Sequence, residues 1–376
     1  MSYSLPPLKL ERYFAEYEFK VRYLLSASDC EALTMSELLD MADPASHELW
    51  NTLVLAYTES QGHTLLRDEV SRQYPPLSAG NVLILVPEEG ILTVMNTMLE
   101  SGDHIVVIAP SYQSLHEIAR SRGVHVTDWP VRPSHEGWYL DIDELAVQIH
   151  ERTRMIVVNF PHNPTGYLPS ASEFNAMVEL AARHGIYVFC DEMYRGLEYS
   201  SERRLTAACA LAEYPRGISL SGMSKTYALP GLRIGWLATR DASLIHKWLT
   251  FKDYTTICSS APSEILALMA LRAREQIIRR NLGIIRTNIT AMEQFCSKHP
   301  ATVVWRAPDA GSVAWIEWKG KGSVASFCQA VLDRKGVMIV PGDMFETGSR
   351  YFRIGLGRRN FVGALHLVDE FLIESR

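Results

Sequence analysis

The sequence predicts an α/β protein with a large domain, built on a mostly parallel doubly wound sheet, and a smaller α+β domain at the C-terminus. Three observations support this fold class. The chain has 376 residues, which is enough for two domains. Its middle part alternates apolar runs of strand length with helical patterns. After about residue 270 this alternation gives way to a long helical pattern followed by strand pairs.

Several apolar runs in the middle of the chain have the length of a strand. Continuous apolar runs are typical of strands that are buried on both faces, as in a parallel sheet. Between two of these runs, Ser170-Ala171-Ser172-Glu173 has the pattern of a capping box, and Gly185 follows the last helical residue. This strand–helix–strand order predicts the doubly wound sheet. The runs are His104–Pro110, Val124–Trp129, Arg154–Phe160, Ile186–Asp191 and Gly217–Ser221.

The C-terminal part predicts the smaller domain. Residues 266–295 have the periodicity of one long amphipathic helix. An antiparallel pair of strands, a helix, two further strands and a final helix follow it, at residues 302–308, 312–318, 324–335, 337–342, 351–357 and from 360 onward. We therefore expect a large domain over residues 46–270 and a small domain over 271–376. Residues 1–45 would form an arm that belongs to the small domain and covers the site.

Composition and charge narrow the class of function. The chain is 47% hydrophobic and 21% charged, which is ordinary for a soluble globular protein. A formal net charge of −6 favours neither nucleic acid nor a membrane as a partner. The six cysteines are scattered without CxxC spacing, so we expect no metal site and no disulfide framework. No apolar run has membrane-spanning length and no signal-peptide core is present, so we expect a cytoplasmic protein.

Unusual polar groups follow three of the predicted strands. Asn163 lies in a turn-rich stretch after one strand, although such a stretch is also compatible with a plain turn. Asp191 ends the next strand, where a carboxylate could instead cap the following segment. Lys225 comes after the third strand, among small and apolar residues where a bare ammonium is costly to bury. Since ligands of open α/β sheets bind beyond the carboxyl ends of the strands, we expect these side chains to share one site.

One ligand, pyridoxal 5′-phosphate, uses all of these groups. A lysine in an apolar pocket has a lowered pKa and forms a Schiff base with an aldehyde. Asp191 can hold a proton on the pyridine nitrogen, which makes the ring an electron sink. Arg233, eight residues after Lys225, can bind the phosphate as a planar fork. The hydroxyls of Ser221 and Ser224, near the lysine, can bind the phosphate together with this arginine. Asn163 and Tyr194 can donate hydrogen bonds to the ring oxygen.

Nearly the whole chain resembles the class I/II aminotransferases of fold type I. The motifs occur in the family's order and spacing: AYTESQGHTLLRDEV with Tyr57, PSYQS with Tyr112, HNPTG with Asn163, FCDEMY with Asp191 and Tyr194, SGMSKTYALPGLRIGW with Lys225 and Arg233, and YFRIGLG with Arg353. By this resemblance Lys225 is the Schiff-base lysine, with Asp191 and Tyr194 as the other catalytic residues. The resemblance also implies that Tyr112 stacks on the cofactor ring and that Arg353 and Asn163 bind the substrate.

The resemblance implies a homodimer whose two sites lie at the subunit interface. In the family, the tyrosine at the position of Tyr57 reaches the cofactor phosphate of the neighbouring subunit. The implied partners are therefore a second copy of the chain and small molecules, namely an amino acid and a 2-oxo acid.

The phosphate-binding turn departs from the family pattern. Where the family usually reads Gly-Ala-Ser/Thr-Glu-Ala before a helix, this chain has Val86-Pro87-Glu88-Glu89-Gly90. Backbone N–H groups at a helix start still bind phosphate, so Glu88, Glu89 and Gly90 remain candidate cofactor-binding residues. We expect both glutamate side chains to lie in a solvated first turn, pointing away from the phosphate that they would repel. Ser221, Ser224 and Arg233 would then carry more of the anion.

The N-terminal arm differs from that of aspartate and aromatic aminotransferases. It is more similar to a divergent group that includes cyclases acting on hydroxyarginine. Three glutamates could face a cationic side chain of a substrate, or could belong to a solvated charged helix: Glu11, Glu16 and Glu18. Two serines, Ser26 and Ser28, are further candidate substrate-binding residues where the arm folds over the site.

The resulting functional prediction is an aminotransferase that moves an amino group between an L-amino acid and a 2-oxo acid through Lys225. The alternative is a pyridoxal-phosphate-dependent lyase or cyclase that acts on a hydroxylated amino acid by β- or γ-elimination. Other enzyme classes fit less well, because the sequence has neither GxGxxG after a strand nor GxxxxGK[ST]. A non-catalytic regulator that retains the cofactor is a further alternative, but no attached DNA-binding segment accompanies the motifs.

Overall fold

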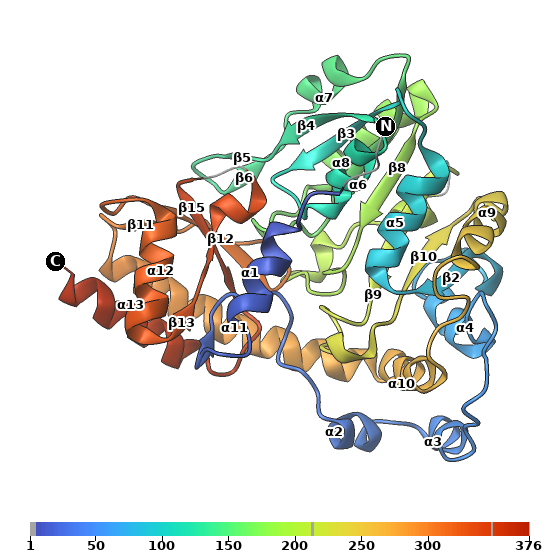
Figure 1. Cartoon of the computed structure of the whole chain (residues 1–376), viewed down its shortest axis with the longest axis horizontal. Helices are drawn as coiled ribbons and strands as arrows, with labels where there is room; N and C mark the ends of the chain where they lie inside the picture. Colours follow the sequence, from blue (N-terminus) through green and yellow to red (C-terminus); the bar gives the residue numbers. More distant parts are fainter. Residues whose placement is uncertain (1–4, 212–213, 347–348, 376) are drawn as a thin grey trace.

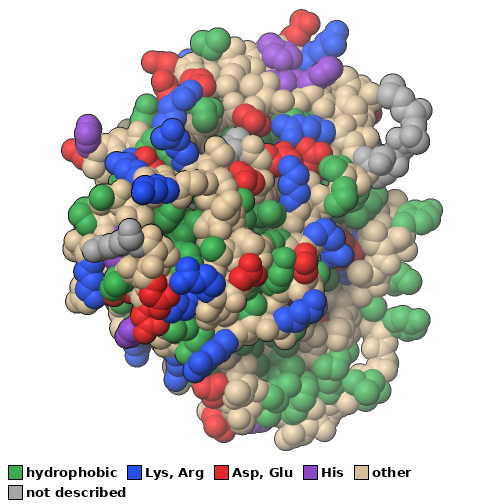
Figure 2. Space-filling model, turned by 60° about the vertical axis from the view of Figure 1, so that its left-hand side comes forward, with side chains coloured by type: hydrophobic (Ala, Val, Ile, Leu, Met, Phe, Trp, Pro, Cys, Tyr) green, Lys and Arg blue, Asp and Glu red, His purple; other side chains and the backbone are tan. Residues whose placement is uncertain are grey.

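The computed structural model describes residues 5–211, 214–346 and 349–375. Figure 1 shows the large sheet beside a smaller C-terminal unit, with the helix of the N-terminal arm between them. None of the helices in the described ranges is long and apolar enough to cross a membrane. Basic and acidic side chains are interspersed on the face drawn in Figure 2.

The large sheet has seven strands in the order β2-β10-β9-β8-β7-β3-β4. Pairing is parallel from β9 to β4, whereas β10 runs antiparallel to both β2 and β9. All five predicted strands are present, so the mostly parallel sheet is confirmed. The strands are β2 (Val82–Leu85), β3 (His104–Ala109), β4 (His125–Pro130), β7 (Thr153–Asn159), β8 (Tyr187–Asp191), β9 (Gly217–Gly222) and β10 (Gly235–Thr239).

Helices cover both faces of this sheet, because alternate residues of its strands pack against different helices. In β3, for example, Val107 belongs to the core under α5, α6 and α9, while Val106 belongs to the core under α7 and α8. A third core joins β2 and β10 to α4 and α10. The helices are α4 (Thr64–Ser71), α5 (Pro87–Met98), α6 (Ser114–Ser121), α7 (Ile142–Gln148), α8 (Ala171–His184), α9 (Ala242–Lys252) and α10 (Ala261–Arg272).

Helix α8 has the boundaries that the sequence predicts. The Ser170 side chain accepts a hydrogen bond from the Glu173 N–H, the Glu173 carboxylate accepts one from the Ser170 N–H, and this reciprocal pair starts the helix. At the other end Gly185 takes the left-handed conformation, with φ 63°, which a glycine adopts without strain.

The smaller C-terminal unit has a four-stranded sheet in the order β11-β12-β15-β14. The predicted antiparallel pair is confirmed, since β11 pairs with β12. The expectation of one long helix over residues 266–295 is wrong, because the helical run breaks at Ala273. The segment before the break, α10, is buried on nearly every side, whereas α11 buries only one stripe. The elements are β11 (Val303–Val304), β12 (Val313–Trp318), β14 (Val340–Pro341), β15 (Tyr351–Gly355), α11 (Arg274–Lys298), α12 (Val324–Lys335) and α13 (Phe361–Glu374).

Strand pairing joins the N-terminal arm to the smaller unit, and the division into domains stays a prediction. Strand β1 (Tyr23–Leu24) pairs parallel with β13 (Val337–Met338). Helix α1 (Lys9–Tyr17) lies against the short 3-10 segment Gly342–Phe345. The remaining elements are α2 (Met35–Asp40) and α3 (Pro44–Asn51), which lie against α10, and the hairpin of β5 (Arg132–Pro133) and β6 (Trp138–Tyr139).

Candidate active site

A cavity of about 550 Å³ lies at the carboxyl ends of β7, β8 and β9. It is closed on other sides by the first turn of α5, by Arg353 of β15 and by helix α1 of the arm. Ligand sites of open α/β sheets are expected in this place. The structure therefore brings together most of the predicted site residues, namely Glu88, Tyr112, Asn163, Asp191, Tyr194, Ser224, Lys225, Arg233, Arg353 and Ser28.

Lys225 follows β9 and its amine lies inside the cavity, where Nζ donates a hydrogen bond of 2.8 Å to Ser28 Oγ. Burial lowers the pKa of Lys225, and nearby Arg353 also lowers it, while Asp29 acts in the opposite direction. A lowered pKa increases the fraction of neutral amine, which is the nucleophilic form. The geometry and the charge environment are those of a lysine that reacts with a carbonyl group.

Asp191 is the last residue of β8 and lies 8% exposed at the floor of the cavity. Its Oδ1 accepts a hydrogen bond from the Met193 N–H at 3.0 Å. Burial raises the pKa of Asp191 to about 7, and the Met193 N–H and the charge of Lys225 offset only part of this effect. A positively charged ring nitrogen at this carboxylate would supply the missing partner.

Asn159, the last residue of β7, is a site residue that the sequence reasoning missed. Its Nδ2 donates to the Asp191 carbonyl at 2.9 Å, and its Oδ1 accepts from the Asn163 N–H at 2.6 Å. Asn159 thus fixes the backbone of two predicted site residues and also lines the cavity. A polar residue at the end of an otherwise apolar strand is the signal that could have identified it.

Arg353 is 1% exposed, yet no carboxylate among the described residues forms an ion pair with it. Nη1 donates to Asn163 Oδ1 at 3.1 Å and Nη2 donates to the Ser26 carbonyl at 3.0 Å, while buried Nε has no hydrogen-bond partner. The rings of Phe14 and Phe345 lie 6.0 and 5.3 Å from the guanidinium carbon. A buried guanidinium without a carboxylate partner fits the binding of a ligand carboxylate.

The expected phosphate end is only partly as predicted. Arg233 Nη1 lies 3.5 Å from Ser224 Oγ, and both residues line the cavity. Ser221 does not line it, because its hydroxyl donates to the Glu192 carbonyl of the neighbouring strand end at 3.2 Å. Gly90 also lies away from the cavity and packs on the sheet, where a Cβ would come within 2.9 Å of Leu85.

The two glutamates of the first turn of α5 point in different directions. Glu89 lies outside the cavity, where its carboxylate accepts hydrogen bonds from Thr255, from Thr256 at 2.8 Å, and from the Val86 N–H at 3.3 Å. Glu88 lines the cavity, so the expectation that it points away into solvent is wrong. Burial raises the pKa of Glu88, which favours the protonated carboxyl and weakens repulsion of an anion.

The arm brings new groups to the cavity. Glu11 and Glu18 of the arm line it, whereas Glu16 does not. Glu11 Oε1 accepts a hydrogen bond of 2.9 Å from the Tyr112 hydroxyl. Burial raises the pKa of Glu18, and the neighbouring charges of Asp29 and Glu11 raise it further. These carboxylates form a negative region at the arm side of the cavity.

The last two predicted residues lie outside the cavity. Ser26 is fully buried, and its carbonyl holds Arg353 while its hydroxyl has no partner among the described residues. Tyr57 is 90% exposed and lines a separate surface hollow with Ser259 and Pro262. The role of Tyr57 across a dimer interface therefore stays a prediction.

The residues of the cavity fit pyridoxal 5′-phosphate. The cavity offers a buried amine, a buried carboxylate and an arginine beside a serine at one end. At the other end lies a guanidinium that forms no ion pair within the described residues, and this set of groups suits the cofactor and a substrate carboxylate. The volume of about 550 Å³ lies in the range of cofactor and ligand pockets.

Comparison with known proteins gives a consistent result. The family model described as aminotransferase class I and II matches residues 25–360. Capreomycidine synthase of Streptomyces vinaceus is 29% identical, covering 94% of this chain and 90% of that protein. Arginine–pyruvate transaminase AruH of Pseudomonas aeruginosa is 26% identical, covering 80% and 77%.

Two solved structures match the fold along nearly all of its length. A PLP-dependent aminotransferase from Streptococcus suis has a TM-score of 0.91 and 28% identity, covering 99% of this chain and 98% of that one. The PLP-dependent cyclase OrfR also has a TM-score of 0.91, with 26% identity and coverage of 100% and 99%. Both are described as dependent on the cofactor that the cavity fits.

Proposed function

Because this chain belongs to the class I and II aminotransferases and is a pyridoxal-phosphate-dependent enzyme, we propose that it transaminates an L-amino acid with a cationic side chain. The single observation that carries the substrate class is the position of Glu11 and Glu18, which line the same cavity as Lys225 and Arg353. Within the described ranges neither carboxylate forms an ion pair with a lysine or an arginine. A cationic substrate group would offset this negative charge.

The two ends of the cavity then bind the two ends of one substrate. Arg353 binds the α-carboxylate with its planar fork, since its Nε has no hydrogen-bond partner in the described part of the chain. Glu11 and Glu18 bind the ammonium or guanidinium of the side chain. Phe14, on the same helix as Glu11, packs over Arg353 and excludes water from the carboxylate contact.

The cofactor would be held by the residues at the strand ends: Asp191 at the ring nitrogen, Asn163 and Tyr194 at the ring oxygen, Tyr112 against the ring, and Ser224 and Arg233 at the phosphate. Pyridoxal 5′-phosphate, when bound, supplies the aldehyde that takes up the substrate amine and the ring that withdraws electrons from Cα. Lys225 Nζ accepts the proton from substrate Cα, and its lowered pKa suits a base that works near neutral pH. Ser28 Oγ, at 2.8 Å from Nζ, orients the amine for this transfer.

A second candidate reaction is elimination followed by ring closure. The match to the cyclase OrfR covers 100% of this chain, the arm included, and capreomycidine synthase covers 94%. The two reactions share removal of the Cα proton by Lys225 and diverge afterwards. Transamination yields a 2-oxo acid, whereas elimination expels a leaving group from the β or γ carbon before the ring closes.

We further propose that the enzyme is a homodimer in which Tyr57 reaches the partner's site. Tyr57 is 90% exposed, and Val54, Leu55 and Tyr254 are also exposed. Exposed apolar side chains in this number favour an interface. A mass measurement in solution decides between monomer and dimer.

The test of the proposed reaction supplies the holoenzyme with pyruvate and single amino acids. L-arginine, its hydroxylated derivative, the neutral isostere L-citrulline and L-norleucine form the panel, and products are identified by mass spectrometry. Alanine and a 2-oxo acid from arginine support transamination, while loss of water from the hydroxylated derivative without alanine supports the cyclase. Turnover of norleucine and citrulline in preference to both arginine compounds would refute the cationic substrate.

A further inference from the structure

Helix α1 carries Glu11 and ends one residue before Glu18, so the protein must hold this helix in one register for both glutamates to face the cavity. The N-cap residue of α1, Leu8, provides no side-chain hydrogen bond. Only one residue of α1, Leu10, is buried. Leu8, Tyr13 and Phe14 pack around it against Trp315, Val340 and Phe345, and the Tyr13 hydroxyl donates to the Ile339 carbonyl at 2.9 Å. The smaller unit therefore holds one face of the helix, whereas the N–H groups of its first turn need further partners.

Gln113 of the large domain supplies the missing cap. Its Oε1 accepts a hydrogen bond from the Lys9 N–H at 2.9 Å, and its Nε2 donates to the Pro7 carbonyl at 3.1 Å. The Gln113 side chain is only 4% exposed, so both of its polar atoms depend on the arm backbone for hydrogen bonds. A buried amide with two backbone partners fixes the position of the chain along α1.

The preceding residue holds the same helix from inside the cavity. Tyr112 donates its hydroxyl to Glu11 Oε1 at 2.9 Å, and Glu11 lies two residues after Lys9. Adjacent residues of one loop thus bind the start of α1 and the first glutamate that faces the cavity. A shift of α1 by one residue would turn Glu11 by about 100° around the helix axis.

We propose that Gln113 is a positioning residue for the substrate side chain, fixing the register of α1 so that Glu11 and Glu18 face the cavity. This inference rests on the proposed function, because it assumes that both glutamates bind a cationic group. Gln113 itself does not line the cavity and touches no reacting atom.

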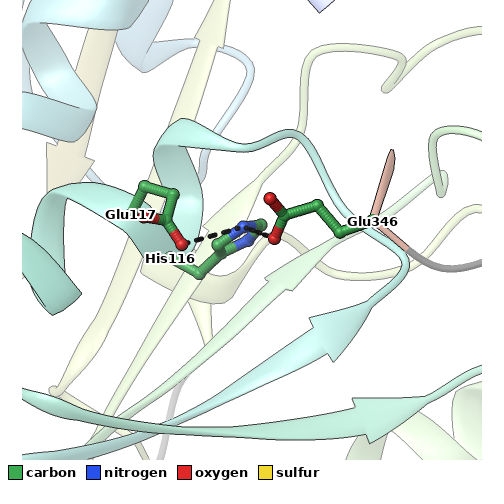
Figure 3. A group of neighbouring side chains, drawn as sticks. All are labelled: His116, Glu117 and Glu346. Carbon is green, nitrogen blue, oxygen red and sulfur yellow. Dashed lines mark ion pairs between the residues drawn. The ribbon is translucent and has the colours of Figure 1, made fainter. Parts of the chain in front are cut away.

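Figure 3 shows a cluster of His116, Glu117 and Glu346, which contacts the same end of α1 through the ion pair of Glu346 with Lys9. Glu346 accepts a hydrogen bond of 2.9 Å from Lys9 Nζ, and its other oxygen lies 3.4 Å from His116 Nε2. Glu117 lies on the other side of this histidine, at 3.7 Å. Arg120 pairs with Glu117 and Lys9 pairs with Glu346, so the cluster is an ion-pair network. Lys9 is about half exposed, so its pair stabilises the arm less than the buried amide does.

The test replaces Gln113 by methionine, which keeps the length of the side chain and removes both hydrogen bonds. Steady-state kinetics are measured for L-arginine and L-norleucine, and hydrogen exchange is measured for residues 9–17 of the holoenzyme. We expect kcat/KM for arginine to fall about tenfold, through KM, with a change below about twofold for norleucine. Exchange in α1 should rise, and a Gln113→Glu variant, which keeps the acceptor for the Lys9 N–H, should restore part of the preference.

Gln329→Met on α12 is the matched control, because Gln329 is an exposed glutamine whose amide bonds only to Asp333. It should change neither measurement. A Gln113→Met enzyme that keeps the wild-type preference for arginine would overturn the inference, whether or not exchange in α1 rises. A wild-type enzyme that does not prefer arginine would instead refute the proposed function itself, so the two failures are distinguishable.

Discussion

The two ends of the cavity are built in different ways. At the cofactor end, Asp191 is the last residue of β8 and Lys225 follows the neighbouring strand β9 of a seven-stranded sheet. The backbone of Asp191 is fixed by its pairing with Leu220 and by the hydrogen bond from Asn159. At the arm end, Glu11 lies on the nine-residue helix α1, which has one buried residue, and Glu18 is the residue that follows this helix. This helix is held by its apolar contacts with the smaller unit, by the hydrogen bonds of Tyr13 and Gln113, and by an ion pair that is half exposed.

From this difference we infer that the cofactor end determines the reaction and that the arm end determines which substrate is preferred. Groups that move protons need fixed positions, and a buried sheet provides them because its hydrogen bonds and its core resist displacement. Groups that recognise a substrate side chain can lie on a helix whose loss leaves the sheet intact. We therefore expect substitutions at the cofactor end to reduce turnover of every substrate, and substitutions at the arm end to change which substrate is preferred.

The largest effect is expected for Lys225→Ala. This change removes the amine that holds the cofactor and moves the Cα proton, so turnover should fall by at least about 1,000-fold for every amino acid. Reduction with borohydride followed by peptide mapping should label wild-type Lys225 and leave the variant unlabelled. Unimpaired turnover in the variant would contradict the role of Lys225 at the cofactor end of the cavity.

Asp191→Asn should have effects of opposite sign on activity and on stability. In the holoenzyme, loss of the carboxylate should slow exchange of the substrate α-proton by about 100-fold or more. In the apoenzyme, burial raises the pKa of Asp191 from 3.8 to about 7, so the folded state binds the proton more tightly than the unfolded state. The stability due to this proton is present below pH 4 and is lost as pH rises to about 7.

The apoenzyme of Asp191→Asn should therefore be more stable than wild type at pH 8, by up to about 4 kcal/mol, and should differ less at pH 5. Urea unfolding at the two pH values measures this difference. An apoenzyme that is destabilised equally at both would show that Asp191 is charged and well paired in the folded protein.

Arg353→Lys should weaken the binding of amino-acid substrates by about 1.5–3 kcal/mol, because an ammonium cannot reproduce the bidentate contact with a carboxylate. Agmatine, which lacks the carboxylate of arginine, serves as the matched ligand, and its dissociation constant should hardly change. Equal weakening of arginine and agmatine would assign Arg353 a structural role.

The sequence predicts the cofactor end better than the arm end, for a physical reason. Lys225, Asp191 and Asn163 follow apolar strands, and the end of a strand is a position that the local pattern reveals. The contacts that hold α1 join residues far apart in the sequence: Lys9 lies 104 positions from Gln113 and 337 positions from Glu346. No local pattern contains such contacts, so the sequence alone leaves open whether Glu11, Glu16 and Glu18 face a substrate or the solvent.

Two expectations from the sequence, the single helix over residues 266–295 and the direction of Glu88, are wrong for the same physical reason. The break at Ala273 follows from the burial of α10 in the large domain, which a continuous helical period does not indicate. The direction of Glu88 into the cavity depends on how α5 sits on the sheet, where Gly90 packs within reach of Leu220. In both cases the tertiary contacts determine what the local pattern leaves undecided.

The smallest expected change tests the central claim, that the arm selects a cationic substrate. Glu18→Gln should lower the ratio of kcat/KM for L-arginine over L-citrulline about fivefold, the equivalent of about 1 kcal/mol, while kcat for citrulline stays within about twofold. Glu16→Gln, on the same helix but outside the cavity, is the matched control and should leave the ratio unchanged. An unchanged ratio in Glu18→Gln, or an equal loss in both variants, would contradict the account.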